Sequence, residues 1–192
     1  MRIVFATGNA HKVREAARSL GEGVELVPLS EAGFDADIPE TEDTIQGNAV
    51  LKARTVHEAL GQPVIAEDTG LEVDALDGAP GVYTARYAGT GRAEDNIAKL
   101  LDALRGETDR RAQFRTVLCH ITADGTVHTH TGLVRGTITT EPMGEGGFGY
   151  DPVFRPAGYD ATFAELDPAI KALISHRALA VGAWARALRA SR

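Results

Sequence analysis

The sequence predicts an α/β fold with an elongated mixed β-sheet and flanking helices, forming two lobes around a central cleft. Two observations support this fold class. Strand and helix patterns alternate through the first half of the chain, and an antiparallel hairpin occupies much of the second half. No internal repeat or shift in composition marks a linker, so residues 1–192 are expected to form a single domain with two lobes.

The first half of the chain contains five alternating segments. Helical segments place apolar residues every three or four positions, whereas strand segments are short apolar runs. The predicted order is a strand over residues 2–6, a helix over residues 12–20, a strand over residues 24–29, a helix from Asp43 to residue 60 and a strand over residues 63–68. Asp43 is the expected N-cap because Gln46 follows three residues later, and Gly61 ends that helix.

The second half begins with a glycine-rich irregular stretch over residues 76–91, followed by a helix over residues 93–104. Asp124-Gly125 is the strongest hairpin signal in the chain and joins predicted strands over residues 112–123 and 126–138. The remaining predicted elements are a loop over residues 144–152, a short helix over residues 168–174 and a last helix capped by Ser175.

The composition is that of a globular protein, with 43% hydrophobic residues, 24% charged residues and a formal net charge of −7. The negative charge and the scattered Lys and Arg residues argue against a nucleic-acid partner, although a local pocket could still bind a small anion. Cys119 is the only cysteine and lies in an apolar run, so no intramolecular disulfide can form. We expect a cytoplasmic protein without a membrane partner, because neither a signal peptide nor an apolar run of about 18 residues is apparent.

Residues 6–12, with the sequence ATGNAHK, follow the first predicted strand and open the first helix. Small residues there leave backbone N–H groups accessible at a helix N-terminus, which favours an anion. Lys12 lies in the first turn, where positive charge opposes the helix dipole unless an anion is nearby. The alternative is a solvated lysine. The segment is not a P-loop, whose motif is absent from the chain.

Other polar residues give similar signals. Asn48 and Lys52 are four residues apart, so they share a helix face beside the apolar stripe and face either a ligand or solvent. His176 and Arg177 follow the predicted cap Ser175 and place positive charge in another first turn.

Glu67 and Asp68 are expected to end the central strand. Ligands of open α/β sheets gather at the carboxyl ends of strands. Two adjacent carboxylates repel each other there, and a divalent cation would relieve that repulsion. Oxygen ligands suit Mg²⁺, which takes one or two protein carboxylates and completes its shell with water and phosphate oxygens. These residues therefore predict a magnesium site.

The loop over residues 144–152 contains the letters G-x-G-x-x-G, but no helix follows as a dinucleotide fingerprint requires. Its aromatics Phe148 and Tyr150 suit either stacking on a base or burial in the core. His120, His128 and His130 offer a second possible metal site, although no cysteine or carboxylate accompanies them at ligand spacing.

Six motifs occur in order along the chain. They are TGNxxK at residues 7–12, NAxxKA at residues 48–53, EDTGLEVDAL at residues 67–76, GAPGVYTARYAG at residues 78–89, GGFGYDPVF at residues 146–154 and SHR at residues 175–177. Together they resemble the inosine/xanthosine triphosphate pyrophosphatase family over essentially the whole chain.

The resemblance implies a two-lobed mixed-sheet fold, usually in a homodimer, and a Mg²⁺-dependent hydrolase that cleanses the nucleotide pool. Such an enzyme converts ITP, dITP or XTP to the monophosphate and pyrophosphate. By motif, the triphosphate would be held by Thr7, Gly8, Asn9, Ala10, His11, Lys12, Lys52 and Lys171. The metal ligands would be Glu40 and Asp68. Glu67 is a further candidate ligand, and Glu42 is the alternative to Glu40. The rest of the nucleotide pocket would comprise Thr69, Phe148, Gly149, Tyr150, Asp151, His176 and Arg177.

In the implied reaction Asp68 accepts the proton of a water that attacks the α-phosphorus, and it acts as metal ligand, base or both. Contacts to the 6-oxo group would set specificity for the base. Two alternatives stay open: a pyrophosphatase for modified pyrimidine or other nucleotides, and a non-catalytic nucleotide sensor that binds without turnover.

Overall fold

The computed structural model describes residues 1–20 and 23–190 of the chain. The chain forms two compact units. Unit 1 comprises Met1–Asp68, Thr116–Gly132 and Ser175–Arg192, and unit 2 comprises Thr69–Arg115 and Leu133–Ile174. Strands β3, β5 and β6 contribute residues to both units.

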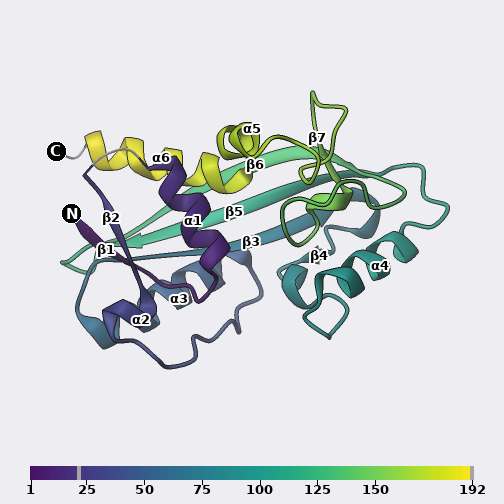
Figure 1. Cartoon of the computed structure of the whole chain (residues 1–192). Coiled ribbons are helices and arrows are strands. Elements are labelled where there is room, and N and C mark those ends of the chain that lie inside the picture. Colours follow the sequence, from purple (N-terminus) through teal and green to yellow (C-terminus); the bar gives the residue numbers. More distant parts are fainter. Residues whose placement is uncertain (21–22, 191–192) are drawn as a thin grey trace. The chain divides into compact units, whose positions relative to one another are not determined.

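The helices and strands alternate in the first half of the chain as the sequence predicts (Figure 1). In chain order the elements are β1 (Arg2–Phe5), α1 (Ala10–Ser19), β2 (Glu25–Pro28), α2 (Leu29–Ala32), α3 (Ile45–Leu60), β3 (Val64–Val73), η1 (Asp74–Leu76), β4 (Pro80–Gly81), η2 (Thr84–Arg86), α4 (Ala93–Ala103), β5 (Arg111–Ile121), β6 (Val127–Ile138), η3 (Asp151–Val153), β7 (Phe154–Pro156), α5 (Pro168–Ile174) and α6 (His176–Ala190). In these described residues no helix is long and apolar enough to cross a membrane.

The strands form one mixed sheet with the order β2-β1-β3-β5-β6-β7, and β4 pairs with β3. Strand β1 is parallel to both β2 and β3, whereas β6 pairs antiparallel with β7. This topology confirms the predicted α/β class with a mixed sheet.

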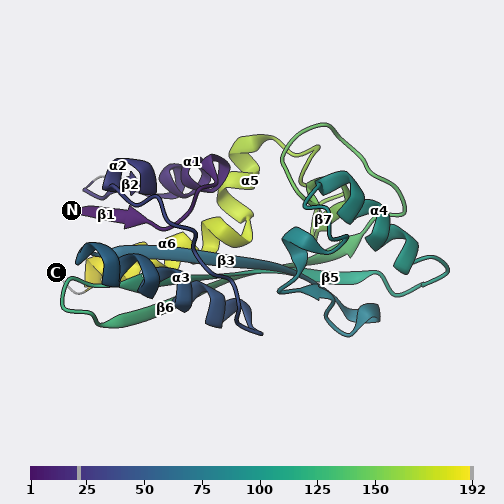
Figure 2. The same cartoon turned by 90° about the horizontal axis from the view of Figure 1, so that it is seen from below.

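Helices cover both faces of the sheet in unit 1. Side chains alternate along a strand, so Ile3 and Phe5 of β1 pack in one cluster with Trp184 of α6, while Val4 packs in another with Val56 of α3. Figure 1 shows α1 and α6 on one side of these strands, and in Figure 2 α3 lies in front of them. Both faces are apolar because both are buried.

The core of unit 2 lies against one face of its strands. Phe114, Phe154 and Phe163 gather there with Leu100 of α4, and the rings of Phe114 and Phe154 meet edge to face with centroids 4.7 Å apart. Neighbours of Phe114 in β5, such as Gln113, point to the opposite face and are only partly buried.

Two helix starts differ from the prediction. Helix α3 is capped by Thr44, whose hydroxyl accepts a hydrogen bond from the Gly47 amide at 2.9 Å, so the predicted cap Asp43 is wrong by one residue. Helix α1 begins at Ala10 because the Asn9 side chain accepts from the His11 amide at 2.9 Å. The Asx cap therefore includes Ala10 and His11 in the helix, and Lys12 still lies in its first turn.

The end of the third strand differs more from the prediction, and this changes where Glu67 and Asp68 lie in the candidate site. Strand β3 continues to Val73 instead of ending at Asp68, because Leu71 and Val73 are fully buried in the core of unit 2. The expectation that Glu67 and Asp68 terminate a strand is therefore wrong. They lie within it, so their side chains point to opposite faces of the sheet.

Gly132 of β6 lies directly beneath α6. A Cβ at this position would overlap the carbonyl oxygen of His176 and the amide nitrogen of Ala180, and would lie 3.0 Å from Cβ of Leu179. These are mostly backbone atoms, which cannot move without displacing the helix. The glycine therefore permits the close approach that places the first turn of α6.

We expect Gly132→Ala to lower the free energy of unfolding by about 1–3 kcal/mol through this overlap. Urea denaturation followed by circular dichroism measures the change. Gly182→Ala in α6 is the control, since its Cβ would meet only the Nη1 atom of Arg186, at 3.5 Å. Equal stability of the two variants would contradict the close packing at Gly132.

Candidate active site

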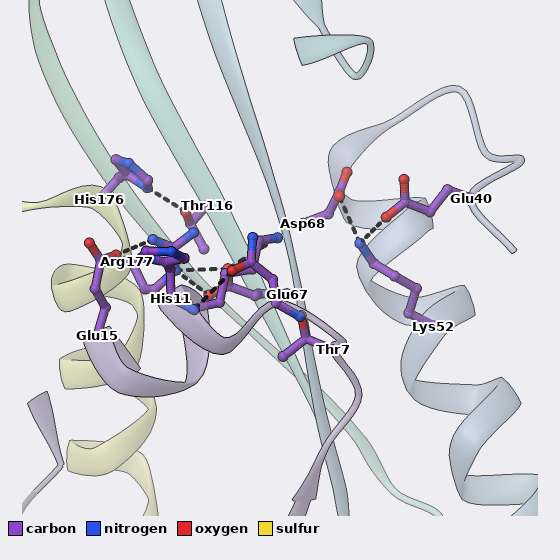
Figure 3. Close-up of polar contacts among 12 residues, drawn as sticks. Thr7, His11, Glu15, Glu40, Lys52, Glu67, Asp68, Thr116, His176 and Arg177 are labelled. Carbon is purple, nitrogen blue, oxygen red and sulfur yellow. Dashed lines mark hydrogen bonds and ion pairs between the residues drawn. The ribbon is translucent and has the colours of Figure 1, made fainter. Parts of the chain in front are cut away.

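Glu67 is the centre of a buried ion-pair cluster in unit 1 (Figure 3). Its carboxylate accepts hydrogen bonds from Nε of Arg177 at 2.8 and 2.9 Å, and Nζ of Lys12 lies 3.4 Å away. Arg177 also pairs with Glu15 of α1 through Nη1. The Glu67 side chain is 0% exposed and that of Arg177 is 2% exposed. The cluster thus joins β3 to the first turns of α1 and α6.

This cluster explains the positive charges at both helix starts. Lys12 and Arg177 oppose the dipoles of α1 and α6, and the sequence suggested that an anion offsets this effect. The structure supplies such an anion from within the chain, since the Glu67 carboxylate meets both cations. Burial alone would raise the pKa of Glu67, but Arg177 and Lys12 hold it below its ordinary value.

A second cluster lies on the other face of β3. Nζ of Lys52 is 2.7 Å from Oε1 of Glu40 and 2.8 Å from Oδ1 of Asp68 (Figure 3). Lys52 is buried, whereas the Glu40 side chain is 39% exposed. The structure thereby brings the predicted base together with the favoured candidate ligand Glu40.

Burial and the partner charges act in opposite directions on the pKa values of Asp68 and Lys52. Burial raises the pKa of the Asp68 carboxyl above its ordinary value of 3.8, although Lys52 opposes the change. Burial also lowers the pKa of Lys52, but the charges and hydrogen bonds of Asp68 and Glu40 reverse the effect and raise it overall. A lysine held protonated beside a carboxylate of raised pKa provides a fixed positive charge and a stronger base.

Glu67 does not join this second cluster. Figure 3 shows Glu67 and Asp68 on opposite sides of β3. Each carboxylate has its own cationic partners, so the expected repulsion between them, from which the metal site was inferred, is not present. No group of three or more His, Cys, Asp or Glu side chains within residues 1–20 and 23–190 is arranged to hold a metal ion.

Asn48 holds the segment that carries Glu40. Its Oδ1 accepts a hydrogen bond from the Glu42 amide at 3.0 Å, and the side chain is buried. Gly47 permits this approach, because a Cβ there would lie 2.8 Å from Cβ of Glu42. The shared face of Asn48 and Lys52 is therefore buried against this segment, and the alternative of a solvated flank is wrong.

The loop before α1 is accessible in unit 1. The Asn9 amide donates to the Thr7 hydroxyl at 3.1 Å, which with the Asn9 cap fixes the turn. Gly8, Ala10 and His11 are exposed, and the first turn of α1 carries no acidic residue. These features are compatible with an anion at the helix N-terminus.

A hydrogen bond to strand β5 fixes the His176 side chain. Its Nδ1 lies 2.6 Å from the hydroxyl of Thr116 on β5, and both residues are buried. Ser175 caps α6 as predicted, because its hydroxyl accepts from the Ala178 amide at 3.2 Å. The sequence gives no signal for Thr116, which is one of several polar residues in β5.

The remaining predicted residues lie in unit 2. Oδ2 of Asp151 accepts from the Phe148 amide at 2.6 Å and from Nζ of Lys171 at 2.7 Å. That ammonium also lies 5.0 Å from the centroid of the Phe148 ring. A cation over an aromatic face is stabilised by the ring's negative charge density. The structure therefore brings Lys171 together with Phe148 and Asp151 of the GGFGYDPVF motif.

Tyr150 differs from its neighbour Phe148. Its ring is buried in the core of unit 2, and its hydroxyl donates to the carbonyl of Thr84 at 3.0 Å. The sequence left base stacking and core burial open for Tyr150, and the structure shows that it is a core residue. Phe148 and Gly149 are partly exposed.

Thr69, the first residue of unit 2, is also partly exposed. Lys171 belongs to unit 2, whereas Lys12 and Lys52 belong to unit 1.

The histidines of β5 and β6 form a separate cluster in unit 1. The rings of His120 and His128 stack with centroids 6.3 Å apart, and Trp184 contacts His120 edge to face at 5.6 Å. Burial, followed by the nearby His128 and His130, lowers the pKa of His120 to about 4. His120 is thus a neutral core residue at pH 7.

This depressed pKa predicts a pH dependence of stability. An exposed histidine titrates near 6.5, so between about pH 6.5 and about 4 the unfolded chain binds a proton that folded His120 does not. The free energy of unfolding should therefore fall as the pH is lowered through this window. Urea titrations at several pH values should show a weaker fall for His120→Gln than for the wild type. Parallel pH profiles would contradict the buried neutral state.

Comparison with known proteins places this geometry in a family. The model of the Ham1 family matches residues 3–187. The chain belongs to the Ham1 family. A dITP/XTP pyrophosphatase of Porphyromonas gingivalis is 53% identical over 182 residues, which cover 94% of this chain and 93% of that protein. A dITP/XTP pyrophosphatase of Flavobacterium johnsoniae is 48% identical, with 94% of each chain covered.

A solved structure agrees with this Ham1-family assignment. The Staphylococcus aureus Ham1 protein is 40% identical to this chain, with a TM-score of 0.92 and 100% of both chains covered. Family membership confirms the resemblance inferred from the six sequence motifs.

Proposed function

We propose that this Ham1-family protein is a nucleoside triphosphate pyrophosphatase that converts dITP, ITP and XTP to the monophosphate and pyrophosphate. Its relatives named dITP/XTP pyrophosphatase share 53% and 48% identity with nearly the whole chain. The structural observation that carries the proposal is the convergence of Glu40 and Asp68 on Lys52. This arrangement combines a potential metal-binding pair with a potential base.

The charges of unit 1 support a role for Mg²⁺. Within the two clusters, three cations (Lys12, Lys52 and Arg177) face four carboxylates (Glu15, Glu40, Glu67 and Asp68). A triphosphate carries several negative charges and would meet this slightly negative group unfavourably. A divalent cation would offset that repulsion, so the proposal includes Mg²⁺ as cofactor.

The donor set fits Mg²⁺ at Glu40 and Asp68 but not at Glu67. Glu40 and Asp68 provide carboxylate oxygens near each other, and Glu40 is partly open to solvent. Glu67 is wholly buried and already meets two cations. The bound ion would polarise the phosphate and stabilise the leaving pyrophosphate.

The chain's own residues would perform the remaining steps. Asp68 takes a proton from water as the water oxygen forms a bond to the α-phosphorus, and the bond to the bridging oxygen breaks to release pyrophosphate. Lys52 holds the carboxylate in position, and burial raises the pKa of Asp68 toward that of a useful base. In unit 1, the α1 N-terminus and Lys12 would bind phosphate oxygens.

A substrate panel with product identification tests the proposal. With Mg²⁺, XTP and dITP should be hydrolysed to monophosphate and pyrophosphate about a hundredfold more efficiently than ATP, since a site that hydrogen-bonds a 6-oxo group discriminates against an amino group. Chelation of Mg²⁺ with EDTA should abolish turnover. Release of orthophosphate alone, equal rates on all substrates, or binding without turnover would reject the proposal.

The substrate panel also includes modified pyrimidine triphosphates, because the alternative function is a pyrophosphatase that acts on these nucleotides. Preferential turnover of these nucleotides would replace the purine assignment. The homodimer implied by the sequence resemblance is a separate proposal, and light scattering after size-exclusion chromatography would test it by measuring the mass relative to the 20.4 kDa chain.

A further inference from the structure

Among residues 1–20 and 23–190, no core cluster covers one face of the sheet of unit 2. Phe114, Ile138 and Phe154 point to the core face. Residues that alternate with them point the other way, and four of these are arginines: Arg111, Arg115, Arg135 and Arg155. We call this surface the arginine face. On this face Arg115 pairs with Glu72 and Arg111 pairs with Asp74.

A cavity of about 600 Å³ opens on the arginine face. Its lining includes Arg111, Arg135, Arg155, Asp74, Thr137 and Tyr159. Strand pairing places Thr137 opposite Arg155, so the hydroxyl and the guanidinium lie on adjacent strands of the same face. The volume lies within the range of pockets that hold small ligands.

The carboxylates near the cavity compensate only part of its positive charge. Arg111 pairs with Asp109 at 2.6 Å and with Asp74 at 3.5 Å. Across the part of the chain that the structure describes, no carboxylate pairs with Arg135 or Arg155. Nε of Arg155 is buried and has no hydrogen-bond partner there. A buried donor without a partner is unfavourable unless a ligand or water satisfies it.

We propose that this cavity binds a small phosphorylated molecule with more than one negative charge. Two guanidinium groups present planar sets of donors that match phosphate oxygens, and their uncompensated charge matches a multiply charged anion. The Thr137 hydroxyl offers another hydrogen bond. None of the lining residues belongs to the predicted nucleotide site, so the inference does not rest on the proposed function.

Titration of the ¹⁵N-labelled protein with inorganic pyrophosphate, in EDTA to remove metal ions, tests this site. The backbone amides of Gly136 and Gly158, which line the cavity, report on it, while those of Gly8 and His11 report on the α1 N-terminus. We expect saturable shifts at Gly136 and Gly158. No saturable shift at these two amides would overturn the proposal, whatever happens at Gly8 and His11.

A charge-matched pair of variants locates the binding. Arg135→Gln with Arg155→Gln should raise the dissociation constant reported by Gly136 and Gly158 at least tenfold. The control, Arg92→Gln with Arg105→Gln, removes the same charge from side chains that are 70% and 82% exposed and outside the cavity, and should change it less than twofold. The single variant Arg135→Gln alters an exposed residue and should weaken binding even if Arg155 is needed for folding.

Citrate tests the choice of phosphate as the ligand chemistry. It has a comparable charge but carboxylate groups, so it should bind at least tenfold more weakly than pyrophosphate. Similar affinity for both anions, or equal weakening by the cavity and control variants, would show a diffuse electrostatic effect and overturn the proposal.

Discussion

Replacing Asp68 with asparagine is expected to lower the rate of XTP hydrolysis by at least about a hundredfold, because the amide cannot accept the proton of the attacking water. The substitution preserves the size of the side chain and its hydrogen bond from Lys52. The fold should therefore survive. Steady-state release of pyrophosphate, with circular dichroism to verify folding, measures the effect.

Asp102→Asn is the matched control for this prediction. Asp102 belongs to α4, and its side chain is 68% exposed. Activity of this variant should stay within about twofold of the wild type, since it removes the same charge far along the chain from the β3 clusters. If Asp68→Asn keeps activity close to that of Asp102→Asn, Asp68 is not the base.

Replacing Arg177 with methionine is expected to lower the free energy of unfolding by about 3–5 kcal/mol, because the carboxylate of Glu67 would stay buried with too little compensating charge. Its remaining cation, Lys12, is 3.4 Å away and itself has a pKa lowered by burial. Urea denaturation at pH 7 measures the loss.

Two further variants show whether the loss comes from the ion pair. Arg186→Met changes an exposed arginine of the same helix and should cost less than about 0.5 kcal/mol. Adding Glu67→Gln to Arg177→Met should recover part of the stability, since it removes the uncompensated charge. Equal losses for Arg177→Met and Arg186→Met, or no recovery in the double variant, would contradict the importance of the buried pair.

The sequence suggested one site containing both Glu67 and Asp68, but the structure places them in two separate clusters on β3. The Glu67 cluster fixes the starts of α1 and α6 to the sheet through buried charges. The Lys52 cluster presents Asp68 and Glu40 on the other face. The positive charges at the helix starts therefore have a structural partner, and phosphate binding there is a property added to that framework.

The sequence alone predicted much of the fold. Helical periodicity located α4 to within one residue and α5 in full, and Asp124-Gly125 located the hairpin between β5 and β6. These elements depend on local signals, namely apolar spacing and turn chemistry, which the sequence contains directly. The predicted strand and helix brought Asp68 and Lys52 forward as site residues, the order of six motifs indicated the family, and Glu40 followed only from that resemblance.

Where a strand ends and which side chains pair depend on segments far apart in the sequence, so only the tertiary structure decided them. Strand β3 passes beyond Asp68 because unit 2 buries Leu71 and Val73, and Glu67 faces Arg177, which is 110 residues away in the sequence. Thr116 and Gly132 have their roles through contacts with α6. Adjacent carboxylates in a sequence are close along the backbone, but in a strand they point to opposite faces, and the long-range packing on each face determines which charges they meet.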